Sequence, residues 1–154
     1  MLDRHVLRMV DLGVFVVANV INLLLVVMFI VRTRAMTRET RVEHVVGLVI
    51  VAMALPLAAA VVVNVIGRRE WWSWALPLVT IAYLILEFVL DHVLKVDFRH
   101  SGLLTPYLIL FYLGQFAMIG YSFGVGKPYG FVTLATYFVN MAATFYSYAR
   151  IGHG

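Results

Sequence analysis

The amino-acid sequence predicts an all-α integral membrane protein, a compact bundle of five transmembrane helices with short loops, in a single domain over residues 1–154. Hydrophobic residues make up 63% of the chain and charged residues 13%, and the mean hydropathy is +0.94. Soluble domains have about 45–50% apolar and about 25% charged residues. The apolar residues gather in runs of about 20, enough to cross about 30 Å of hydrocarbon. Open sheet cannot satisfy its backbone there, so the runs are expected to be helices.

Five apolar runs are separated by short polar segments. We expect helices over about residues 8–31, 44–66, 71–94, 103–125 and 129–149. Asp11 and Arg32 bound the first run, and His44 and Arg68 bound the second, so charges mark where each helix leaves the hydrocarbon. Glycine, proline and charge interrupt the apolar pattern at the later breaks, which are GRRE at 67–70, KVDFRHSG at 95–102 and GVGKPYG at 124–130.

The composition excludes several classes of function. The chain has no cysteine, which excludes disulfides, thiol catalysis and cysteine-held zinc or iron–sulfur sites. The net charge of +4 comes from basic residues outside the apolar runs, the usual distribution at a membrane interface, so no nucleic-acid partner is expected. Membrane lipids are the partner that the composition implies.

The distribution of lysine and arginine predicts a protein of the cell membrane, the cytoplasmic membrane, with its amino terminus outside and its carboxyl terminus inside. The inner set would be Arg32, Arg34, Arg38, Arg41, Lys95, Arg99 and Arg150. The outer set would be Arg4, Arg8, Arg68, Arg69 and Lys127. The larger inner set follows the positive-inside rule, and Trp71, Trp72 and Trp74 are then expected at the outer interface.

A glutamate interrupts the apolar run YLILEFVLDH at 83–92. If Trp74 lies at the outer interface, Glu87 lies 13 residues deeper, or about 20 Å at about 1.5 Å per residue. A carboxylate at that depth is costly unless it is protonated, paired or facing water. No lysine or arginine falls within an apolar run. Glu87 is therefore expected to be neutral, or to await a proton, a cation or a cationic ligand.

Other polar residues form stripes along the predicted helices. Helical spacing places Thr80, Tyr83, Glu87 and Asp91 on one face of the third helix. The fifth helix carries Thr133, Thr136, Asn140, Thr144 and Ser147. Polar stripes do not face lipid cheaply, so we expect them to face a common interior. The candidate ligand-binding residues are Glu87, Asp91, Tyr83, Thr80, Gln115, Asn140, Thr144 and Asn22.

The stripes also have a purely structural interpretation. Serine, threonine and asparagine often hold transmembrane helices together through hydrogen bonds of about 1 kcal/mol or less, and a protonated glutamic acid does the same. A metal site is not expected, because Asp91 and His92 are adjacent and point about 100° apart on a helix. No cofactor is expected, and no catalytic residue can be assigned.

Three functions remain open from the sequence. The first is binding or transport of a cation, a proton or a small polar or cationic solute through an intramembrane pocket, in a homodimer, with Glu87 as charge partner and Asp91 as relay. The second is an intramembrane enzyme acting on a lipid or isoprenoid-like substrate, with Glu87 as general acid or base. A non-enzymatic role is preferred because no catalytic signature appears. The third is a non-catalytic subunit or assembly factor of a larger membrane complex.

Overall fold

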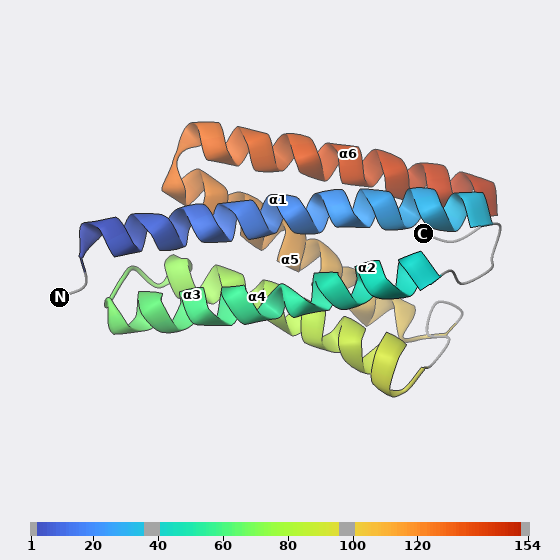
Figure 1. The fold of residues 1–154 in the computed structure, drawn as a ribbon, viewed down its shortest axis with the longest axis horizontal. Helices are drawn as coiled ribbons and strands as arrows, with labels where there is room; N and C mark the ends of the chain where they lie inside the picture. The colour runs from blue at the N-terminus through green and yellow to red at the C-terminus, as the bar shows by residue number, and fades with distance from the viewer. Residues whose placement is uncertain (1–2, 36–40, 96–100, 152–154) are drawn as a thin grey trace.

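The computed structural model describes residues 3–35, 41–95 and 101–151, and this part of the chain contains helices and no strand. The elements are α1 (Arg4–Ala35), α2 (Arg41–Ala52), α3 (Ala54–Ile66), α4 (Trp72–Glu87), the π-helical η1 (Phe88–Val93), α5 (Leu104–Val125) and α6 (Lys127–Ile151). Because α3 follows α2 after one residue and η1 continues α4, these elements form five long helices (Figure 1). The predicted all-α bundle is confirmed.

Four of these helices are long and apolar enough to cross a membrane: Arg4–Ala35, Arg41–Ile66, Trp72–Val93 and Leu104–Val125. This identifies an integral membrane protein. The last helix, α6, has 25 residues and is about 37 Å long at about 1.5 Å per residue. It falls outside the apolar set because polar side chains lower its hydropathy, yet it lies beside α1 along most of its length (Figure 1).

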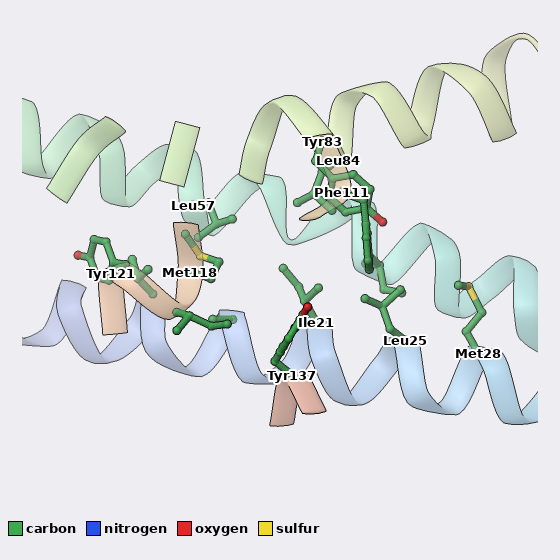
Figure 2. Packing of buried hydrophobic residues seen from close by; sticks show 14 of the residues in the cluster. Ile21, Leu25, Met28, Leu57, Tyr83, Leu84, Phe111, Met118, Tyr121 and Tyr137 are labelled. Atoms are coloured by element: carbon green, nitrogen blue, oxygen red, sulfur yellow. The ribbon is translucent and has the colours of Figure 1, made fainter. Parts of the chain in front are cut away.

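The helices close a ring. α1 packs against α3 and α6, α3 packs against α4, α4 against α5, and α5 against α6. The core inside this ring is drawn in Figure 2, where side chains from all five long helices interdigitate. Its most deeply buried members include Ile21, Leu25, Leu57, Tyr83, Leu84 and Tyr121.

The second long helix is interrupted where its sequence predicts strain. Met53 separates α2 from α3, and Pro56 lies one turn further along. A proline has no N–H to donate to the carbonyl four residues back, and its ring crowds that carbonyl. In α4 the helix continues through Pro77, which is buried against the core.

The connections define two ends of the bundle. We call one the Arg69 end, where α1, α4 and α6 begin and α3 and α5 finish, and the other the Glu87 end, where α2 and α5 begin and α1, η1 and α6 finish. The basic residues of the predicted inner set that the structure describes belong to the Glu87 end: Arg32, Arg34, Arg41, Lys95 and Arg150. Arg38 and Arg99 of that set lie outside the described residues.

Candidate functional site

Glu87 is the last residue of α4 and is buried, with 4% of its surface exposed. The next six residues, Phe88–Val93, form the π-helical turn η1. There the Leu94 N–H donates to the Val89 carbonyl at 2.8 Å, five residues back. The wider turn shifts Asp91 and His92 from the positions of a regular α-helix. π-Helical turns are rare in proteins as a whole, but those that occur are often found at functional sites.

Two tyrosines lie beside Glu87. The Tyr107 hydroxyl, from α5, donates to Glu87 Oε2 at 3.4 Å, a long hydrogen bond. The buried Tyr83 hydroxyl has no hydrogen-bond partner among the described residues. It is nevertheless near enough to interact electrostatically with both Glu87 and Tyr107. The predicted pair Tyr83 and Glu87 is thus brought together, with one phenol hydroxyl unmatched.

A single antiparallel register brings α5 to this site. Tyr107 lies opposite Glu87, and Phe111 packs its ring 5.3 Å from that of Tyr83. Further along, Thr80 donates to the Gly114 carbonyl at 3.1 Å. A Cβ at position 114 would lie 3.5 Å from the Thr80 Cα, in ordinary van der Waals contact, so the two helices pack closely here. Thr80 therefore joins α4 to α5.

His92 continues the polar site toward α2. Its ring centroid lies 5.2 Å from that of His44 and 5.7 Å from that of Phe88, on which it stacks. The His92 Nδ1 atom is buried with no hydrogen-bond partner within the described part of the chain. Position 47 is glycine, and a Cβ there would lie 3.7 Å from the His92 ring. His44 is exposed and Asp91 is half-buried, so this arm reaches from Glu87 toward the surface.

The stripe on α6 contacts α1. The Asn22 amide donates to Thr136 Oγ1 at 3.1 Å, and Thr136 donates to Asn19 Oδ1 at 2.8 Å. The Asn19 amide donates to Thr133 Oγ1 at 3.1 Å, and Thr133 in turn bonds Ser122 of α5 at 2.9 Å. We call this set, Asn19, Asn22, Ser122, Thr133 and Thr136, the asparagine–threonine seam. These hydrogen bonds join α1, α5 and α6, which is the helix-packing role that the structural interpretation of the stripes assigns to them.

The remaining candidates lie along the same interior without direct bonds to Glu87. Thr144 donates to the Asn140 carbonyl of its own helix at 2.9 Å. Asn140 is fully buried, and neither atom of its amide group has a partner among the described residues; the same holds for Asn22 Oδ1. Gln115 is buried on α5, next to Gly114. The structure thus brings Tyr83 to Glu87, places Thr80 at the α4–α5 crossing, buries Gln115 on α5, and joins Asn22 to α6.

A further polar network, not found from the sequence, lies at the Arg69 end. Arg69 donates to both Asp11 carboxylate oxygens, at 2.6 and 3.1 Å, and to Asn64 Oδ1 at 3.1 Å. The Asn64 amide donates to the Ser73 carbonyl at 2.7 Å, and the Tyr121 hydroxyl donates to Asp11 at 2.8 Å. The bonded Asp11 carboxylate raises the pKa of Arg69, against the opposing effect of burial. The signal for this network was that Asp11 and Arg69 are opposite charges predicted at the same membrane face.

Two of the hollows on the described surface lie away from Glu87. One of about 500 Å³ is lined by Val65, Arg68, Arg69 and Trp74. The other, of about 230 Å³, lies between α1 and α3 around Gly13, Pro56 and Ala60. Neither is lined by Glu87. Among the described residues, no three histidine, aspartate or glutamate side chains gather to hold a metal ion. No protein-family model, curated protein or solved structure matches the chain.

Proposed function

We propose that this protein binds a cation, a proton or a small polar or cationic solute at an intramembrane site built around Glu87. One observation carries the proposal. His92 follows the buried Glu87 carboxyl within one π-helical turn. A buried polar atom beside Glu87 and another in the His92 ring have no hydrogen-bond partner in the described chain. These are the Tyr83 hydroxyl and His92 Nδ1. Buried polar groups are nearly always hydrogen-bonded. Unmatched groups near a carboxyl therefore favour a site that exchanges a proton, a water or a cation.

Within this class the geometry favours a proton. A proton needs no cavity, and neither of the two hollows is lined by Glu87. Tyr107 holds the carboxyl through a long bond of 3.4 Å, which can shorten when the carboxyl ionises. His92 lies one turn beyond Glu87 and its ring faces that of the exposed His44, so polar side chains lead from this part of the helix toward the surface. Asp91 lies on the same arm and would act as a relay.

Transport requires an orientation, and we propose the amino terminus outside and the carboxyl terminus inside the cell membrane. The support is the positive-inside count from the full sequence, seven basic residues in the predicted inner set against five in the predicted outer set. Because the chain has no cysteine, single cysteines at Gly102 and Lys127 can be labelled from one side of intact cells. Labelling of Lys127→Cys by an impermeant reagent, without labelling of Gly102→Cys, is expected. The reverse pattern would invert the orientation.

A homodimer is part of the same proposal. The hollow between α1 and α3 is lined by small residues, Gly13, Ala59 and Ala60 among them, and small residues let transmembrane helices approach closely. Substituting leucine at Ala59 should weaken cross-linking between copies in native membranes. Cross-linking that does not change, or that is absent in the wild type, would remove the dimer from the proposal.

The deciding experiment is difference infrared spectroscopy of the protein in nanodiscs between about pH 4 and about pH 10. A carboxyl signal that titrates in the wild type should be absent from Glu87→Gln and present in Glu70→Gln, the matched change at an exposed carboxyl of the other end. If an added alkali cation or amine displaces the same signal, the ligand is a cation. A Glu87 carboxyl that stays protonated throughout would instead be a packing residue, and the proposal would fail.

The alternatives from the sequence have less support. A partner subunit was expected to fill the polar face, but much of the α6 stripe is hydrogen-bonded to α1 through the asparagine–threonine seam. An enzyme acting on a lipid or isoprenoid-like substrate needs its reacting carboxyl beside an opening to lipid. The two hollows lie elsewhere, around Trp74 and around Gly13.

A further inference from the structure

The hollow at the Arg69 end has the character of an anion site. It measures about 500 Å³ and is lined by Val65, Arg68, Arg69 and Trp74, where α3 finishes and α4 begins (Figure 1). Both charged residues of the lining are arginines. We infer that this hollow binds the phosphate group of an anionic phospholipid, independently of the Glu87 site.

The two arginines have different roles. Arg69 is fixed in the wall, because three of its N–H groups are used by Asp11 and Asn64. A guanidinium has five N–H donors, so two remain for a ligand. The Asp11 carboxylate balances the positive charge of Arg69. Arg68 is exposed and forms no ion pair with the described residues, so it supplies the unbalanced positive charge that an anion requires.

The backbone holds Arg68 at this position. Its φ is +49°, in the left-handed region that ends helices. The Arg69 N–H donates to the Asn64 carbonyl at 3.1 Å, and the Arg68 N–H to that of Val65 at 3.0 Å. These bonds close the end of α3 immediately before the two arginine side chains. A planar guanidinium binds two phosphate oxygens at once, which a lysine ammonium does not do.

The surroundings favour a lipid over free phosphate. Trp74 lines the hollow, Trp71 is exposed beside it, and Trp72 lies with its ring 6.0 Å from the Arg69 guanidinium. Tryptophan concentrates at the level of lipid headgroups. Directly below, Val62, Val65 and Ile66 expose an apolar surface on α3. A phospholipid would place its phosphate between the arginines and an acyl chain along this surface.

One acidic group lies in the same loop. Glu70 accepts a hydrogen bond from Trp72 Nε1 at 2.5 Å and is not part of the lining. Its contact with Trp72 leaves both arginine side chains as the charged part of the wall. The charged residues that line the hollow are therefore Arg68 and Arg69, and the Glu70 carboxylate lies outside the lining.

Tryptophan fluorescence tests this inference directly, because all three tryptophans of the chain lie between residues 71 and 74. The purified full-length protein in a neutral detergent is titrated with short-chain phosphatidylglycerol, phosphatidylcholine or inorganic phosphate. Removing one arginine near a membrane surface is worth about fivefold in affinity for an anionic lipid. The Arg68→Gln variant should bind phosphatidylglycerol about fivefold more weakly, with Arg68→Lys between it and the wild type.

Arg8→Gln is the matched control, since Arg8 is an exposed arginine of α1 at the same end and does not line the hollow. It should bind like the wild type. Equal weakening in Arg8→Gln, or none in Arg68→Gln, would overturn the inference in favour of diffuse surface charge. Inorganic phosphate binding as tightly as phosphatidylglycerol, and depending on Arg68, would overturn the lipid assignment. Circular dichroism checks that each variant remains helical, and Arg68→Lys keeps the test valid if Arg68→Gln does not fold.

Discussion

At the Arg69 end of the bundle, the buried polar atoms are joined to one another, whereas beside Glu87 and in His92 two of them, and in Asn22 and Asn140 three more, have no partner among the described residues. The Arg69 guanidinium donates to Asp11 and Asn64, and the Tyr121 hydroxyl donates to the same Asp11 carboxylate. Beside Glu87, the Tyr107 hydroxyl donates a long bond to the carboxyl, and the Tyr83 hydroxyl has no hydrogen-bond partner among the described residues. A complete network rigidifies a bundle, while an incomplete one leaves capacity for an exchangeable ligand.

The difference is also energetic. Leaving a buried donor or acceptor unsatisfied costs about 1–3 kcal/mol. Because the chain supplies hydrogen-bond partners for its buried polar atoms at the Arg69 end, the same residue types could have supplied them at the Glu87 end. Local departures from good packing are expected where function requires them, and the π-helical turn after Glu87 is a second such departure in the same place.

Breaking the Arg69 end should have the largest effect. Arg69→Gln leaves the Asp11 carboxylate, whose side chain is 14% exposed, without its cation. The loss should be about 2 kcal/mol of unfolding free energy, between the values for exposed and for buried pairs. Unfolding by a denaturing detergent in mixed micelles measures it. Arg68→Gln, the adjacent arginine without an ion pair to the described chain, should cost less than about 0.5 kcal/mol; equal losses would mean that the network adds no stability.

One chemical change compares the two ends directly. Tyr121→Phe removes the hydroxyl that donates to Asp11, and should cost about 1.5 kcal/mol because the acceptor is charged. Tyr83→Phe removes a hydroxyl without a partner among the described residues. It should be neutral or stabilising by about 0.5 kcal/mol, since the desolvated group disappears with its cost. The same unfolding assay compares both variants, and a large loss in Tyr83→Phe would mean that its hydroxyl is bonded in the membrane.

A substitution in the asparagine–threonine seam should cost an amount of stability between those of Tyr121→Phe and Tyr83→Phe. Thr136 accepts from Asn22 and donates to Asn19, so Thr136→Val loses two interhelical bonds without a change of shape. Such bonds average about 0.6 kcal/mol each in membranes, which predicts a loss of about 1 kcal/mol. Thr144→Val is the control, because the Thr144 hydroxyl bonds only a carbonyl of its own helix. If both variants lose the same stability, the seam does not hold α1 to α6.

Much of the fold was accessible from the sequence because hydrophobic run length and helical spacing are properties of one segment at a time. They predicted the five-helix bundle, the burial of Glu87 and its shared face with Tyr83. Spacing shows which residues share a face, but it does not say which neighbour that face meets. The α6 stripe was therefore grouped with Glu87, although its Thr136 bonds α1.

The features that were missed depend on how helices meet. Tyr107 became a partner of Glu87 through the antiparallel register of α4 and α5, which no single helix encodes. The π-helical turn η1 places His92 beside Gly47 of α2, a contact between two helices that spacing along one helix does not predict. Asp11 and Arg69 are far apart in the chain, and only the closed ring of helices makes them neighbours.

The smallest expected effect concerns pH and separates the two ends most cleanly. The pKa of Arg69 is raised by its bond to Asp11, so its stabilising contribution is complete below the ordinary guanidinium pKa and is lost only as pH rises through the higher folded value. Between about pH 6 and about pH 10, the difference in unfolding free energy between the wild type and Arg69→Gln should change by less than about 0.3 kcal/mol. The difference between the wild type and Glu87→Gln should change over the same range, because a carboxyl that exchanges a proton binds it to a different extent in the folded and unfolded chain. A change that levels off within this range is expected if folded Glu87 releases its proton there, whereas a change that continues to about pH 10 would mean that folded Glu87 stays protonated and is a packing residue. If neither difference depends on pH, Glu87 is already ionised in the folded chain, and proton exchange in this range is ruled out.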